Sequence, residues 1–168
     1  VTPVTLRARF NPNATGPESE PAPGTLPPSV DVRQISLLGA GWTVGSLKYL
    51  SEACVQSITY YETTGWRGVM EVEEGCAAPE QFRSVPDGAF PLYHVLVDFG
   101  GMFGGEIVPS KSSDSLLVDG LILKKGPWVR MLIANLTAEA REVTVQYPGL
   151  QGFVRVEVLD ETNVEMAM

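Results

Sequence analysis

A glutamate, a tryptophan and an arginine lie close together in the stretch SITYYETTGWRG, residues 57–68. Glu62 ends a β-branched and aromatic run, and Trp66 and Arg67 follow it in a Gly-Trp-Arg-Gly turn. A carboxylate acts as a general acid or base, or accepts hydrogen bonds from sugar hydroxyls. An indole offers a flat face for a sugar ring, and a guanidinium holds a carboxylate or polarises a carbonyl. The stretch therefore predicts a site with Glu62 as its catalytic residue.

A second polar cluster ends the first apolar run of the chain, TPVTLRARFNP, at Arg9 and Asn11. Apolar and polar residues alternate along this run, which predicts a strand over residues 4–10 with one apolar face. The substrate-binding residues that we expect from the two clusters are Arg9, Asn11, Tyr60, Trp66 and Arg67.

Each of these residues also has a structural alternative. Glu62 could cap its turn by accepting from the amide of Thr64 or Gly65, Trp66 could be core packing, and the arginines could form structural ion pairs. His94 is expected to be a solvated helix residue, and the acidic run 71–75 a solvated loop rather than a cation site.

The elements around these clusters alternate between strand and helix. Asp31, with Gln34 three residues later, fits a capping box and starts a predicted helix over residues 31–53. A strand over 55–61 and a helix from Pro91 to about Phe103 follow, the second helix with an apolar stripe at helical spacing. Alternation of this kind predicts an α/β fold with parallel strands and crossover helices.

The pattern changes near residue 104. From there short apolar runs follow one another at close spacing, with turn residues between them and no helical window. This favours an antiparallel β-sandwich. We therefore predict two domains: residues 1–103, α/β, and residues 104–168, all-β.

Two parallel strands do not form a stable sheet by themselves. The simplest way to complete the sheet is a (β/α)8 barrel whose last two units are residues 5–53 and 55–103. The first partner that we expect for this chain is therefore the remainder of its own barrel. In such barrels the active site lies at the C-terminal ends of the strands, where both polar clusters fall.

Charge and composition exclude several classes of function. The formal net charge is −8 and no dense Lys/Arg cluster occurs, which argues against nucleic acid or an anionic membrane as a partner. One histidine and two cysteines at wide spacing predict no metal site. We expect no cofactor. Cys54 is expected to be a free thiol buried at a helix end, and the absence of a signal segment favours a cytoplasmic location.

With these residues in view, the chain resembles clan-A glycoside hydrolases and, more narrowly, the D-apionate lactonase family. The similar stretches are TLRARFNP, ISLLGAGWTVGSLKYLSEA, SITYYETTGWRGVME, FPLYHVLVDFGG and RMLIANLT. The resemblance implies hydrolysis of a sugar-acid lactone by a (β/α)8 barrel that carries a β-sandwich.

The sequence departs from the glycoside hydrolase pattern, which uses two carboxylates on different strands. The end of the strand before Glu62 reads Phe10-Asn11-Pro12, without a carboxylate. A lactonase, with one base to activate water and one cation to polarise the carbonyl, is compatible with this. The expected ligand is a sugar or sugar lactone.

A second class of function stays open, a non-catalytic carbohydrate-binding or accessory module in which the β-sandwich is the functional part. If the chain is instead the end of an enzyme, we expect it to be inactive alone. Its open sheet and helix faces would then be covered by the missing strands or by a homo-oligomer contact.

Overall fold

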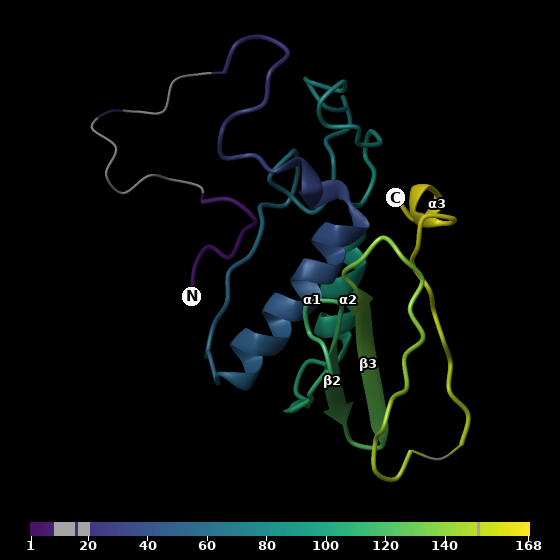
Figure 1. Ribbon diagram of the computed structural model, residues 1–168. Coiled ribbons are helices and arrows are strands. Elements are labelled where there is room, and N and C mark those ends of the chain that lie inside the picture. The colour runs from purple at the N-terminus through teal and green to yellow at the C-terminus, as the bar shows by residue number, and fades with distance from the viewer. Residues whose placement is uncertain (9–15, 17–20, 151) are drawn as a thin grey trace.

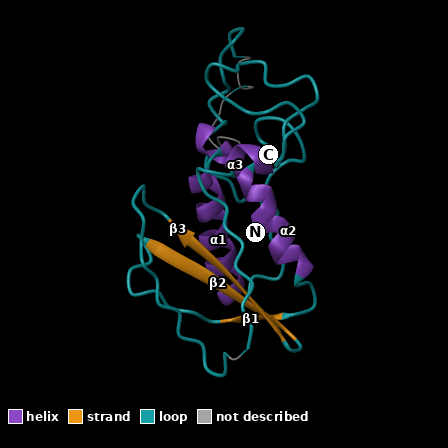
Figure 2. Ribbon diagram, turned by 90° about the vertical axis from the view of Figure 1, so that its right-hand side faces the viewer, coloured by secondary structure: helices purple, strands orange, loops and turns teal. Residues whose placement is uncertain are grey.

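The computed structural model describes residues 1–8, 16, 21–150 and 152–168. Two helices lie in the middle of the molecule, a small sheet packs at one end, and long loops gather at the other (Figures 1 and 2). In chain order the elements are η1 (Val32–Ile35, a 3-10 helix), α1 (Leu37–Glu52), α2 (Pro91–Gly101), β1 (Glu106–Val108), β2 (Val118–Lys125), β3 (Trp128–Asn135) and α3 (Val164–Ala167). No helix within the described ranges has the length and apolar character to cross a bilayer.

Residues 1–4 run beside residues 57–59 of the predicted strand 55–61 in the parallel direction, although neither segment forms a regular strand. Of the other predicted strand, 4–10, only Val4 takes part in this contact, and residues 9–10 lie outside the described residues. The amino group of Val1 donates to the carbonyl of Ser57 at 2.7 Å, and the amide of Thr59 donates to the carbonyl of Val1 at 3.0 Å. This pair of bonds is the parallel ladder pattern. Pro3 has no N–H for the next bond, and the amide of Val4 donates to Thr59 instead, at 2.8 Å.

The predicted helix 31–53 consists of two pieces. Asp31 caps η1 by accepting from the amide of Arg33, and Ser36 caps α1 by accepting from the amide of Gly39. The buried face of α1 includes Ala40, Val44 and Leu47, whereas Leu38, which the helical spacing of Ile35, Leu38 and Trp42 predicts to be on the apolar face, is exposed. The glycines explain the shift, because a Cβ on Gly41 would lie 2.9 Å from the side chain of Leu136.

Helix α2 is confirmed, with Pro91 in its first turn and Leu92 and Val95 buried. It ends at Gly101, so Phe103, where the helix was predicted to end, lies beyond it and is exposed. His94 is half-buried rather than solvated, because its Nε2 lies 2.9 Å from the carbonyl oxygen of Ala167, the last residue of α3.

The second half of the chain contributes one antiparallel sheet in the order β1-β2-β3. Lys125 pairs with Trp128, so the Lys-Lys-Gly stretch forms the β2–β3 hairpin tip. Segments 141–149 and 152–161, predicted as strands, pair with no strand of the described residues, and the end of the chain forms α3 instead of a strand. The predicted second sheet of a β-sandwich thus stays a prediction.

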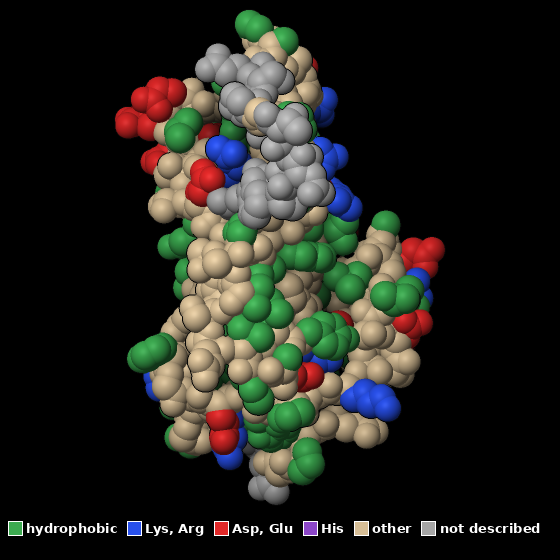
Figure 3. All heavy atoms as spheres, turned by 90° about the vertical axis from the view of Figure 1, so that its left-hand side faces the viewer, with side chains coloured by type: hydrophobic (Ala, Val, Ile, Leu, Met, Phe, Trp, Pro, Cys, Tyr) green, Lys and Arg blue, Asp and Glu red, His purple; other side chains and the backbone are tan. Residues whose placement is uncertain are grey.

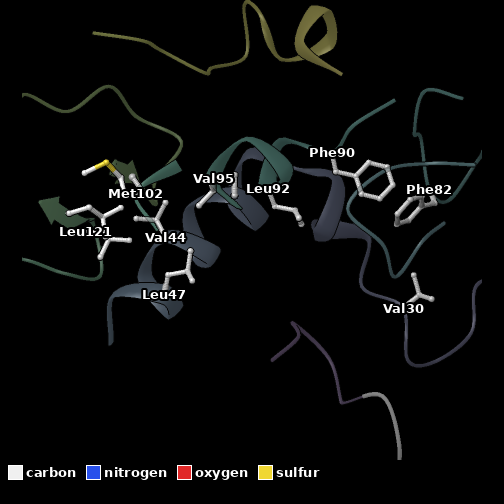
Figure 4. Close-up of a cluster of buried hydrophobic side chains, with 12 residues drawn as sticks. Val30, Val44, Leu47, Phe82, Phe90, Leu92, Val95, Met102 and Leu121 are labelled. Atoms are coloured by element: carbon white, nitrogen blue, oxygen red, sulfur yellow. The ribbon is translucent and has the colours of Figure 1, made fainter. Parts of the chain in front are cut away.

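One hydrophobic core runs through both halves of the chain. Figure 4 shows it extending from Leu121 on the sheet, past Val44 and Val95 on the helices, to Phe82 and Phe90 in the loop region. The ring centroids of Phe82 and Phe90 lie 5.7 Å apart in an edge-to-face arrangement, a favoured geometry for aromatic pairs. The core thus joins the sheet to the loop end of the helices.

A buried ion pair adds to this contact. Lys48 Nζ on α1 lies 2.7 Å from Asp119 Oδ1 on β2, and both side chains are only 3% exposed. The hydroxyl of Tyr49 and the amide of Gly120 also donate to the same carboxylate, each at 2.8 Å. The sheet is therefore fixed to α1 by charge as well as by apolar contact.

Candidate active site

The candidate site is built on the tight turn that follows the extended segment 57–61. Two tyrosine hydroxyls hold this segment against α1: Tyr60 lies 2.9 Å from Ser46 Oγ and Tyr61 lies 3.1 Å from Thr43 Oγ1. Burial raises the pKa of Tyr60, and the hydrogen bond with Ser46 offsets only part of this effect. The segment therefore ends at a fixed place, with Glu62 as the first residue beyond it.

Residues 62–70, here called the 62–70 turn, are closed by four backbone hydrogen bonds of 2.7–3.1 Å. One joins the amide of Glu62 to the carbonyl of Arg67, and another joins the amide of Gly65 to the carbonyl of Met70. Gly65 has a φ of +77°, which favours glycine, and a Cβ on Gly68 would lie 2.6 Å from the backbone of Thr64. The glycines of the Gly-Trp-Arg-Gly stretch are thus needed for this turn.

The turn brings the carboxylate of Glu62 and the guanidinium of Arg67 together. Oε1 lies 3.4 Å from Nε, with exposed fractions of 46% for Glu62 and 36% for Arg67. Since the amide of Gly65 donates to Met70, it does not cap the turn through Glu62. The pair presents an accessible base and an accessible cation side by side.

The remaining predicted site residues have different surroundings. Trp66 is half-buried and packs against the core, as the core-packing alternative predicted. Its contact with a sugar ring stays a prediction. The hydroxyl of Tyr60 is directed to α1, and its contact with a substrate stays a prediction. Arg9 and Asn11 lie outside the described residues.

Helix η1 supports the turn from the side. The side-chain amide of Gln34 is buried and donates to the carbonyl of Gly68 at 2.5 Å. We predicted Gln34 as half of a capping box; its side chain instead fixes the 62–70 turn. A hydrogen bond across 34 residues leaves no local signal in the sequence.

Beside η1 lies a hollow of about 390 Å³, here called the arginine pocket, lined by Arg7, Leu26, Pro27, Pro28, Asp31, Arg33 and neighbouring residues. The carboxylate of Asp31 is 5% exposed and accepts from Arg33 Nη2 at 2.7 Å and Nε at 2.9 Å, while Arg7 Nε lies 3.6 Å away. The Arg33 hydrogen bond is the main reason why the pKa of Asp31 is lowered. Figure 3 shows basic side chains both at the loop end and in the lower half of the molecule, with acidic side chains near them.

Two further predictions are corrected in the loops. Glu71, expected in a solvated loop, is 2% exposed, and its carboxylate accepts from Ser84 Oγ and from the amide of Val72. Cys54 is free as expected but exposed rather than buried, because the chain turns at a φ of +57° directly after α1. Among the described residues no group of three or more metal-binding side chains occurs.

Comparison with known proteins gives one finding. The family model described as D-apionate lactonase, TIM barrel domain, matches residues 1–104, which include the extended segments, both long helices and the 62–70 turn. No curated protein and no solved structure matches the chain. The match covers more than half of the 168 residues, and we conclude that the chain belongs to the D-apionate lactonase family, through its TIM barrel domain.

Proposed function

We propose that this chain forms the last two β/α units of a (β/α)8 barrel in a sugar-acid lactonase that hydrolyses a D-apionolactone-like substrate. The observation that carries the proposal is the Glu62–Arg67 pair at the end of segment 57–61. This position corresponds to the C-terminal end of a barrel strand, where TIM-barrel active sites lie.

The chemistry that we propose for the pair is addition of water to the lactone carbonyl. Glu62 takes a proton from the attacking water, and the oxygen forms a bond to the carbonyl carbon. Arg67 donates a hydrogen bond to the carbonyl oxygen as negative charge develops on it. The ring C–O bond then breaks, and the proton held by Glu62 passes to the leaving oxygen, so that one lactone and one water give one hydroxy acid. Trp66 offers the accessible part of its indole ring to the apolar face of the sugar.

We also propose that the other barrel strands come from polypeptide outside these 168 residues, with residues 1–103 completing the barrel and residues 104–168 forming a β-sandwich domain. Two hydrogen bonds in the parallel pattern and a third from the amide of Val4 join segments 1–4 and 57–59. Such a pair needs further strands for stability. The antiparallel sheet β1-β2-β3 is compatible with one layer of the sandwich.

The test uses the natural polypeptide that contains these residues, with acid release from D-apionolactone and other aldonolactones followed in a pH-stat. Replacing Glu62 with Gln removes the base at nearly constant size, and we expect lactone turnover to fall by a factor of about 10² to 10⁴. Arg67→Gln should lower kcat/KM as well. Cleavage of aryl glycosides is measured in parallel, to separate a lactonase from a glycosidase.

Glu74→Gln is the matched control, because Glu74 is an exposed glutamate of the following loop. It should retain wild-type turnover and melting temperature. Unchanged turnover in a folded Glu62→Gln variant would return Glu62 to a structural role. Wild-type cleavage of aryl glycosides without lactone turnover would refute the proposed reaction.

A further inference from the structure

The arginine pocket combines features that the proposed hydrolysis does not use. Of the charged groups in its lining, Arg7 and Arg33 are cationic and Asp31 is anionic, which leaves a formal surplus of one positive charge. The two guanidinium groups are each 55% exposed, whereas Asp31 is buried beneath them. The charge that faces solvent is therefore positive.

The two guanidinium groups are held in place before any ligand arrives. Arg33 donates hydrogen bonds from Nε and Nη2 to the carboxylate of Asp31. Arg7 donates from Nη1 to the carbonyl oxygens of Pro28 and Val30, at 3.1 and 3.2 Å. A guanidinium has five N–H donors, so within the described part of the chain each keeps donors beyond those bonds. Because the side chains are already ordered, a ligand does not have to immobilise them.

The shape and walls of the pocket indicate the class of ligand. A volume of about 390 Å³ lies within the range of small-molecule sites. Leu26, Pro27 and Pro28 supply apolar wall beside the two forks, and arginine forks match the geometry of carboxylates. A monoanion neutralises the single positive charge in surplus, whereas a dianion would leave the occupied pocket with a net negative charge.

We propose that the arginine pocket binds a small monocarboxylate through Arg7 and Arg33, with Asp31 as the internal counter-ion that orients them. Gln34 connects this pocket with the 62–70 turn, because the short helix η1 is capped by Asp31 and carries both Arg33 and the glutamine that binds Gly68. The identification of the ligand with the hydroxy acid released from a lactone rests on the proposed function. The binding of a monocarboxylate rests on the pocket alone.

The experiment measures binding of sodium D-apionate by isothermal titration calorimetry to the natural polypeptide that contains the chain. The neutral polyol D-apiitol and inorganic phosphate serve as comparison ligands. We expect D-apionate to bind, the polyol to give no measurable heat, and phosphate to bind more weakly. Arg33→Gln should weaken D-apionate binding about tenfold or more, since it removes one charged fork.

Arg83→Gln is the matched control, because it makes the same change at an exposed arginine of the 71–90 loop, outside the pocket. Its affinity for D-apionate should lie within about twofold of the wild type. If Arg33→Gln does not fold, Arg33→Lys keeps the charge and loses the fork, and should weaken binding less than Arg7→Gln, which loses the charge.

Three results would overturn the pocket proposal: no binding of D-apionate by the wild type, equal binding by folded Arg33 variants, or tighter binding of phosphate. None of these results changes the outcome of the lactone assay with Glu62→Gln. The pocket proposal and the proposed reaction can therefore be refuted separately. Carboxylate binding that depends on Arg33, in a protein without lactone turnover, would keep the pocket and refute the reaction.

Discussion

The contact between Lys48 and Asp119 shows how much depends on a single pair of side chains. Both groups are almost fully buried, and 71 residues separate them in the sequence. Burial alone would lower the pKa of Lys48, but the hydrogen bond and charge of Asp119 more than offset it, so that its pKa is raised. For Asp119, burial acts in the opposite direction and is also outweighed, which leaves its pKa lowered. Both groups are therefore charged when the protein is folded at neutral pH.

Removing one partner of this pair should be costly. Lys48→Met leaves a buried carboxylate without its cation, and we expect a loss of about 3 kcal/mol or more in the free energy of unfolding. The double variant Lys48→Met/Asp119→Leu should recover much of this loss, because no buried charge is left. Urea unfolding at pH 7, followed by circular dichroism, measures both.

The exposed ion pair between Lys124 and Glu106 is the control, since its side chains are 44% and 68% exposed. Lys124→Met should cost less than about 1 kcal/mol. A Lys48→Met variant as stable as Lys124→Met would contradict the assigned role of the buried pair.

Asp31 predicts a pH dependence of stability. Its folded pKa lies below the ordinary value of 3.8, mainly because of the hydrogen bond from Arg33. Its contribution is therefore fully present above that value and is lost as the pH falls through the lower folded value. We expect the urea midpoint to decrease as the pH is lowered from about 4 toward 2.

The variant Asp31→Asn tests this assignment. It should be less stable than the wild type at pH 7, because two arginines lose their counter-ion, and its stability should change less over the acid range. A variant that loses stability in parallel with the wild type below pH 4 would show that other carboxyl groups carry the effect.

At the same scale, sequence reasoning found some site residues and missed others for a clear reason. Glu62 and Arg67 are five positions apart in one turn, so composition and spacing were enough to bring them together. Asp31 and Arg33 are two positions apart, but Arg7 meets them only through the tertiary fold. The pairing of Lys48 with Asp119 depends on how α1 packs on β2, which no local pattern encodes.

At the scale of elements, α1 shows what its glycines do. A Cβ on Gly39 would lie 2.4 Å from the carbonyl oxygen of Arg33, whereas a Cβ on Gly45 meets nothing within 4 Å. The first glycine allows η1 to fold back on the start of α1. The second only lowers the intrinsic helix propensity.

The two glycines therefore predict opposite effects of the same substitution in the same helix. Gly39→Ala should destabilise the protein by about 1–3 kcal/mol, because backbone has to move. Gly45→Ala should stabilise it by about 0.5–1 kcal/mol, as expected for a helix interior position with open space. Chemical unfolding of both variants measures the difference, and a shift of the same sign in both would contradict the argument.

Hydrophobic periodicity predicted an element well where the residues that pair or pack with it are close in the sequence. Helix α2 and the β2–β3 hairpin are of this kind, because their partners are close in sequence. Segments 141–149 and 152–161 alternate as strands do, but within the described residues no neighbouring strand completes them. A strand needs a partner for its backbone groups, so alternation alone does not make one.

At the scale of the whole molecule, the family match and the packing describe different units. The match ends at residue 104, whereas the core continues from Val44 and Leu47 on α1 to Leu121 and Ala134 on the sheet. A second link joins Arg130 on β3 to the carboxylate of Asp98 on α2 at 2.9 Å. The sheet thus stabilises the positions of helices α1 and α2.

At this scale, an exposed apolar surface lies on the segment near the end of the chain. Segment 152–158 presents Phe153, Val154, Val156 and Val158 to solvent, and the three valines alternate with the charged residues Arg155 and Glu157. An exposed apolar run with strand-like alternation is a template for pairing with another chain. We expect the isolated 168-residue chain to associate as its concentration rises, which sedimentation velocity over about 5–200 μM would detect.

One charge on this run should weaken the association. Val156 is 76% exposed, so Val156→Lys should change the free energy of unfolding by no more than about 0.5 kcal/mol. It should nevertheless shift the association to higher concentration, because a lysine on an unpaired edge opposes pairing. Thr162→Lys adds the same side chain outside the run and should leave the association unchanged. If the wild type stays monomeric throughout, or if the two variants associate alike, the run is not the contact, and the exposed faces of the helices become the surfaces to test.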